Sequence, residues 1–386
     1  MVTSVGLSPD DHGFRPGAGT DPGEVLHLGG TPLPLTVPAR LYVCGITPYD
    51  VTHLGHASTF VWADVVARVM RMAGVDTVVS RNVTDVDDVL TRTAAERGRQ
   101  FDEFGLTQEF HFDRDMASLH VRPPTHAPHA RHHVSHVVRL AMALLAAGAA
   151  YERDGFVYFR GAGVAEGRDR HAALALLAEN GDQPDDPLRD DPFDVPVWRP
   201  SGEGDPAWPS PWGRGRPGWH AECAAMALAT LGGVVDVLVG GADLEFPHHA
   251  YQGAMASAAT GSGPFARREV RAGTVGRDGV KMAKSTGNLV LGGDLLRESS
   301  GAAVRLMLLD RAWSRPWDYT PDALEQAEAL LEQLYVAAGT RNGSVTAVAA
   351  VRGALLNDLD VPEAVRLAVE SGGDAARQVL RTLALQ

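Results

Sequence analysis

The chain carries, at residues 39–45, the segment Ala39-Arg40-Leu41-Tyr42-Val43-Cys44-Gly45, which predicts a short buried strand that ends in glycine. A turn at Thr47-Pro48-Tyr49-Asp50 follows, and apolar residues then recur at spacings of three and four from Ala57 to Met72, which predicts a helix. Asp76 to Val83 reads as a second strand. This strand–turn–helix–strand order indicates an α/β fold with a doubly wound parallel sheet.

A third strand is predicted at Val234 to Gly241, where the glycines allow a ligand or another backbone to approach. Pro321 is expected to open a helix near the end of the chain. We expect an irregular N-terminal lead-in (1–39), the first half of the sheet domain (40–125), an inserted connective subdomain (126–193), the second half (194–275), a lysine-loop segment (276–315) and a C-terminal helical domain (316–386).

The composition narrows the possible classes of protein. Two cysteines in 386 residues exclude a disulfide scaffold and suit a reducing cytosol. The first residues do not read as a signal peptide, and the longest apolar run, Leu140 to Ala150, is too short to span a bilayer. The net charge of −13 favours small-molecule substrates over nucleic acid. We therefore expect a cytoplasmic monomer without membrane contact.

Two histidines, His53 and His56, lie three residues apart at the expected start of the first helix. The amides and the dipole of a helix N-terminus favour phosphate, and imidazoles beside it can stabilise charge on a reacting phosphate. Taken alone, such a pair more often consists of ordinary core or surface histidines.

The chain contains only two lysines, and both lie in the loop Lys281-Met282-Ala283-Lys284-Ser285. Lysine is a compact charge on a flexible stem, which suits a departing pyrophosphate. A solvated surface loop is the alternative, and the absence of lysine elsewhere favours a function.

Cys223 lies in a segment that also holds histidine, glycine and tryptophan, Cys44 is followed by glycine and by two histidines, and a third segment, Gly240 to His249, ends in two further histidines. Two thiolates and an imidazole suit Zn²⁺, and three protein ligands with one open position are typical of a catalytic site. The spacing is not that of a zinc finger, and a lone cysteine is more often a small buried apolar residue.

Together these segments resemble the class I aminoacyl-tRNA synthetases, and within them the cysteine-specific branch and its mycothiol cysteine ligases. The resemblance covers about residues 40–300. It is carried by six ordered segments: Tyr42 to Asp50, the paired histidines, Arg81 to Asp88, Trp219 to Cys223, Asp243 to His249 and the lysine loop.

The resemblance implies a Rossmann-like catalytic domain and a role for each matching residue. It assigns Zn²⁺ to Cys44, Cys223 and His248, with the substrate thiolate in the open position. It implies that the residues that stabilise charge during catalysis are His53, His56, Lys281 and Lys284. It implies that ATP binds with Mg²⁺. The residues that contact the substrate or ATP would be Gly45, Thr47, Thr84, Trp219, Gly240, Gly241, Asp243, Val275 and Ser285.

Three positions depart from the family pattern. Ala250 and Gln252 stand where the cysteine branch has glutamates, one of them a further zinc ligand, and Ala283 replaces a serine. A neutral amide is a poor zinc ligand, so we expect three protein ligands.

The implied activity is an AMP-forming ligase that activates L-cysteine and transfers it to the amine of glucosaminyl-inositol. Three alternatives stay open: a related ligase for another amine or amino acid, a short cysteinyl-tRNA synthetase, and a non-catalytic synthetase-like binding protein. The tract His126, His129, His132, His133 and His136 is expected to be a solvated helix face rather than a second metal site.

Overall fold

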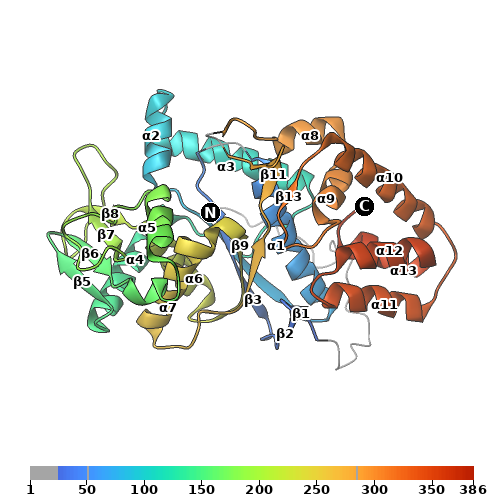
Figure 1. The fold of residues 1–386 in the computed structure, drawn as a ribbon, viewed down its shortest axis with the longest axis horizontal. Coiled ribbons are helices and arrows are strands. Elements are labelled where there is room, and N and C mark those ends of the chain that lie inside the picture. Colours follow the sequence, from blue (N-terminus) through green and yellow to red (C-terminus); the bar gives the residue numbers. More distant parts are fainter. Residues whose placement is uncertain (1–24, 50–51, 284–285) are drawn as a thin grey trace, which may run out of the picture.

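A computed structural model describes residues 25–49, 52–283 and 286–386, and at its centre lies a four-stranded parallel sheet (Figure 1). Its strand order is β10 (Ala266–Ala272), β9 (Val235–Gly241), β3 (Ala39–Ile46) and β4 (Thr77–Val83). Tyr42 in β3 lies opposite Ser80 on one side and Leu238 on the other. Chain order reverses between β3 and β9, so the predicted doubly wound sheet is confirmed and its switch point lies between these two strands.

Alternate residues of β3 point to opposite layers of the molecule. Leu41 and Val43 pack in the same apolar cluster as α1 (Leu54–Met72), whereas Tyr42 and Cys44 pack with residues of α6 (Trp219–Leu231). Both faces of the sheet are therefore covered by helices, which is why the central strands β3 and β9 are mostly apolar. The helix predicted from Ala57 begins three residues earlier, at Leu54, because the His53 side chain caps its first turn.

The insertion follows β4. Before it come α2 (Asp88–Glu96) and α3 (Phe101–Ser118), and it begins with α4 (Ala130–Ala146). Its antiparallel sheet consists of β5 (Ala150–Arg153), β6 (Phe156–Phe159), β7 (Val195–Pro200) and β8 (Gly215–Pro217). The short helix η2 (Ala162–Ala165) and α5 (Arg170–Glu179) lie between β6 and β7. The boundary expected at residue 193 falls inside this sheet, because β7 pairs with β6 across a long connection that the local pattern does not reveal.

After β9 come the short helical turns η3 (Ala242–Leu244) and η4 (Glu245–His249), then α7 (Ala250–Thr260) and β10. The lysine-loop segment contributes a small sheet of β12 (Val280–Lys281), β11 (Val275–Arg277) and β13 (Trp317–Asp318), with α8 (Gly292–Glu298) and α9 (Gly301–Leu309) between its strands.

The C-terminal region is helical, as predicted, with α10 (Pro321–Ala338), α11 (Val345–Leu356), α12 (Val361–Ser371) and α13 (Gly373–Thr382) at the end opposite the antiparallel sheet (Figure 1). These helices share one apolar core with α1. None of the helices in the described ranges has the length and apolar character needed to cross a membrane.

The lead-in is more ordered than its composition indicates. Residues 1–24 lie outside the described part, but β1 (His27–Leu28) and β2 (Thr31–Pro32) form a short hairpin. Its turn is held by a hydrogen bond from the Gly29 amide to the Asp358 carboxylate at 2.8 Å. A contact 329 residues away in the chain fixes this segment, so the local sequence does not predict it.

Candidate active site and metal centre

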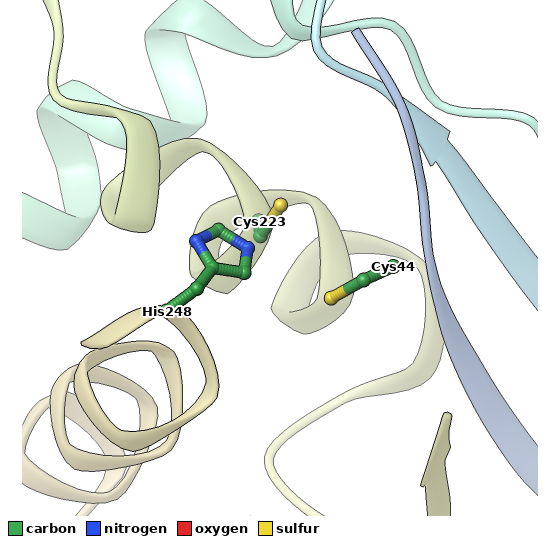
Figure 2. A group of neighbouring side chains, drawn as sticks. All are labelled: Cys44, Cys223 and His248. Carbon is green, nitrogen blue, oxygen red and sulfur yellow. The ribbon is translucent and has the colours of Figure 1, made fainter. Parts of the chain in front are cut away.

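Cys44, Cys223 and His248 lie together behind the ends of β3 and β9 (Figure 2). The alternation along β3 turns Cys44 toward α6, where Cys223 occupies the second turn, and His248 comes from η4. The ligand atoms of the three residues all lie within 4.8 Å of one another, and all three residues are buried. The fold thus gathers the predicted ligand set from three distant segments.

The chemistry of this cluster fits a soft divalent metal ion. Burial and the neighbouring Cys223 thiol raise the pKa of Cys44 well above its usual value. Burial also holds the pKa of His248 well below its usual value, so the imidazole is neutral, which is the form that binds metal. Two thiolates and a neutral imidazole are a typical donor set for Zn²⁺, whose charge would offset the cost of two buried thiolates.

Two neighbouring side chains, His220 and Trp219, orient the imidazole of His248. The Nδ1 atoms of His248 and His220 lie 2.9 Å apart, and burial lowers the pKa of His220 to about 4. The Trp219 ring stacks on His248 with 4.2 Å between centroids. The contact with His220 occupies Nδ1 of His248 and leaves Nε2 to bind a metal ion, an arrangement common among metal-binding histidines. His220 was not singled out from the sequence, although it lies inside the Trp219 to Cys223 segment.

The side chain of Gln252 contacts the thiol of Cys44. Its side chain is fully buried, and its Oε1 accepts a hydrogen bond from the Cys44 thiol at 3.3 Å. Its Nε2 has no partner among the described residues. Glu222 is also buried and has no hydrogen-bond partner among the described residues, and burial raises its pKa well above the usual value. The cluster is thus accompanied by a neutral amide and by a carboxyl group that burial favours in its neutral form.

An open cavity adjoins the cluster and is lined by Cys44. Ten of the predicted site residues line this cavity: Cys44, Gly45, Thr47, His53, His56, Trp219, Gly241, Asp243, Val275 and Lys281. Four others do not line it, namely Thr84, Gly240, Cys223 and His248, and Lys284 and Ser285 lie outside the described residues.

The paired histidines lie at the N-terminus of α1, with their rings stacked 3.9 Å apart. Across the cavity, Lys281 Nζ forms an ion pair with the Asp243 carboxylate at 2.7 Å, and both side chains are about half exposed. The two residues predicted for pyrophosphate and for adenosine are therefore in contact with each other.

Hydrogen bonds fix the end of β3 where the amino acid was predicted to lie. The hydroxyl groups of Thr47 and Thr84 lie 2.8 Å apart, and Thr84 donates to the Ile46 carbonyl. The Gly45 amide donates to the Asn82 side chain at 2.9 Å. A Cβ at Gly45 would lie 1.7 Å from the Asn82 carbonyl oxygen, so only glycine fits. Asn82 was missed as a positioning residue.

The histidine tract is partly solvated, as expected, but the side chain of His129 also contacts two carboxylates. Its Nδ1 lies 3.0 Å from Asp85 and its Nε2 lies 3.3 Å from Glu109. These two carboxylates raise the pKa of His129 to about 9. The tract therefore does meet acidic groups, but they come from distant parts of the chain.

Residues 36–329 match the family described as tRNA synthetases class I (C) catalytic domain. The L-cysteine:1D-myo-inositol 2-amino-2-deoxy-α-D-glucopyranoside ligase of Mycolicibacterium vanbaalenii is 44% identical, over 85% of this chain and 79% of that protein. The enzyme of the same name from Streptosporangium roseum is 41% identical, over 88% and 84% of the two chains.

Solved structures agree in fold. Methionyl-tRNA synthetase of Mycobacterium tuberculosis in complex with methionyl-adenylate superposes with a TM-score of 0.61 at 18% identity, covering 90% of this chain and 82% of that one. The chain therefore belongs to the class I tRNA synthetases of the cysteine type and, within them, to the family of L-cysteine:1D-myo-inositol 2-amino-2-deoxy-α-D-glucopyranoside ligases.

Proposed function

We propose that this protein activates L-cysteine with ATP as cysteinyl-adenylate and transfers the cysteinyl group to the amine of glucosaminyl-inositol, which yields an amide and AMP. Family membership makes the chain an ATP-dependent, amino-acid-activating ligase. The observation that carries the proposal is the buried cluster of Cys44, Cys223 and His248, which meets the substrate cavity at Cys44.

The cluster supports selection of cysteine by its sulfur. A metal ion bound there would supply one open position for a soft ligand. Shape alone separates cysteine poorly from serine, whereas binding of sulfur does so strongly. Thr47 and Trp219 line the same part of the cavity and would orient the amino and carboxylate groups.

The other side of the cavity supports adenylation. His53 and His56 at the N-terminus of α1 would stabilise charge on the α-phosphate as the cysteine carboxylate attacks it. Asp243 would hold the adenosine, and Lys281 would turn from Asp243 to the departing pyrophosphate. We extend this role to Lys284 from the resemblance alone.

The C-terminal region supports a small acceptor rather than tRNA. Residues 316–386 hold ten acidic and only five basic side chains. A surface for tRNA needs positive charge to neutralise phosphates. These helices instead share the core of α1, which suits a supporting role.

The deciding experiment measures AMP and amide formation by purified, zinc-loaded protein with cysteine, ATP and either glucosaminyl-inositol or tRNA. We expect turnover with the amino sugar and none with tRNA. The opposite pattern would overturn the proposal in favour of tRNA charging.

A second candidate rests on Ala250 and Gln252, which replace the glutamates of the cysteine branch beside the metal cluster. A related ligase could use another amino acid. ATP–pyrophosphate exchange with all twenty amino acids separates the two, because exchange with anything but cysteine would favour this second candidate.

A further inference from the structure

A second, small cleft lies between α1 and the segment that follows α3. Its walls are largely apolar and are formed by Val43, Phe60, Ala63, Ala67, Val79 and Val121. Phe60 is the only lining residue that it shares with the active-site cavity. The cleft is thus a separate space on the α1 side of the sheet.

Three guanidinium groups line this cleft, from Arg71, Arg81 and Arg122, against a single carboxylate, Asp64. Arg81 has its own partner, since its Nη2 donates to Asp113 at 2.8 Å and its guanidinium lies over the Phe112 ring.

Asp64 is already occupied by other arginines. It accepts hydrogen bonds from Arg68 Nε at 2.6 Å and from Arg305 Nη2 at 2.5 Å. Arg122 reaches it only through its backbone amide, at 3.2 Å. The charge of the Asp64 carboxylate is therefore balanced by Arg68 and Arg305, neither of which lines the cleft.

Arg71 and Arg122 are left without a carboxylate in contact. Among the described residues, neither guanidinium has a hydrogen-bond or ion-pair partner, and Arg71 Nη1 is fully buried. Burial lowers the pKa of both groups, and Arg122 further lowers that of Arg71. A guanidinium nevertheless stays charged in proteins, so the cleft holds positive charge without its counterion, in a chain of net charge −13.

We propose that this cleft binds a small oxyanion, held between Arg71 and Arg122. Planar guanidinium groups match the geometry of carboxylate and phosphate oxygens and often bind them through two hydrogen bonds. The apolar side chains beside the guanidinium groups also suit the hydrocarbon part of a small carboxylate, so the two anions to be tested are inorganic phosphate and a small carboxylate. Its site is distinct from the positions proposed for ATP.

The experiment titrates the full-length protein with phosphate or with isobutyrate at constant ionic strength and follows the melting temperature and the heat of binding. The wild-type protein is expected to bind one of the two anions with a dissociation constant on the order of 1 mM. A stronger effect of phosphate identifies a phosphate site, and a stronger effect of isobutyrate identifies a carboxylate site.

Two variants and a control locate the site. Arg122→Gln and Arg71→Gln should each weaken binding at least about tenfold. Arg139→Gln, which removes an exposed arginine on α4, should leave binding unchanged. Circular dichroism without anion confirms that each variant is folded. The proposal is overturned if neither anion binds the wild-type protein, or if folded Arg122→Gln and Arg71→Gln bind as the control does.

Discussion

At the scale of single residues, the metal cluster shows which features of the site can be predicted from the sequence and which cannot. Cys44, Cys223 and His248 were named through the resemblance, and only the folded chain brings their ligand atoms within 4.8 Å. No spacing rule links positions 44, 223 and 248. The sequence offered the donor chemistry, but the distance between the donors depends on β3, α6 and η4 packing together.

Replacing one thiol tests the ligand assignment. Cys223→Ser should lose stoichiometric zinc, because a hydroxyl is a poor ligand for this soft ion, and should also lose discrimination between cysteine and serine. Metal content is measured by elemental analysis and selectivity by ATP–pyrophosphate exchange. Full zinc occupancy in the variant would contradict the assignment.

Replacing Gln252 tests the metal site by adding a ligand instead of removing one. Gln252→Glu places a carboxylate next to Cys44, where it can serve as a fourth ligand. Zinc should bind about tenfold more tightly, because a carboxylate joins the two thiolates and the imidazole as a ligand. A chelator competition measures the affinity. Gln326→Glu, at an exposed site on α10, is the matched control and should leave zinc affinity unchanged.

His129 makes stability depend on pH. Its pKa of about 9 in the folded protein exceeds the ordinary value of 6.5, so the bonds to Asp85 and Glu109 favour the protonated ring. This stabilisation is complete below pH 6.5 and is lost as the pH rises through 9. His129→Asn should therefore cost ~1–2 kcal/mol near pH 6, after allowance for solvent screening, and much less above pH 9.

Urea denaturation of the wild-type protein and of His129→Asn between pH 6 and pH 9.5 measures this difference in unfolding free energy. A difference that stays constant across this range would show that His129 acts by packing alone.

At the scale of elements, the pattern of apolar residues predicted β3, α1, β4 and β9 within three residues of their observed ends. What it missed includes β10, the edge strand beside β9, and β7 and β8, which join an antiparallel sheet across a long connection. It also missed the β1–β2 hairpin, which depends on Asp358. These elements are fixed by partners distant in sequence, and a local pattern contains no information about such partners.

The close approach of β3 to β4 at Gly45 is testable. Gly45→Ala puts a methyl group against the Asn82 carbonyl and should destabilise the protein by about 2–4 kcal/mol. Gly353→Ala in α11 is the control, since a Cβ there meets nothing within 4 Å and should be neutral or slightly stabilising. Thermal unfolding compares the two. Equal stability of both variants would mean that the strand end adjusts freely.

At the scale of the whole molecule, one buried arginine ties the C-terminal region to the catalytic core. Arg305 in α9 is fully buried and donates to the Leu383 and Leu119 carbonyls and to the Asp64 carboxylate. Three segments that lie far apart in sequence thus meet at one side chain.

Arg305→Met should destabilise the protein by about 3–5 kcal/mol, because it leaves buried acceptors without their donor. Arg139→Met, at the exposed surface of α4, is the control and should change stability little. Urea denaturation followed by far-ultraviolet circular dichroism measures both. An unfolding free energy of Arg305→Met close to that of the control would show that the C-terminal helices are held by apolar contacts alone.

The sequence by itself determined the parallel sheet, the helix N-terminus beside it and the donor groups available for metal and phosphate, because these follow from local periodicity and residue chemistry. The tertiary structure alone decided that Gln252 rests on Cys44, that Lys281 pairs with Asp243 and that Arg71 and Arg122 share a cleft without a carboxylate of their own. The physical reason is that burial and charge balance depend on which distant segments pack together, and packing is a property of the whole chain.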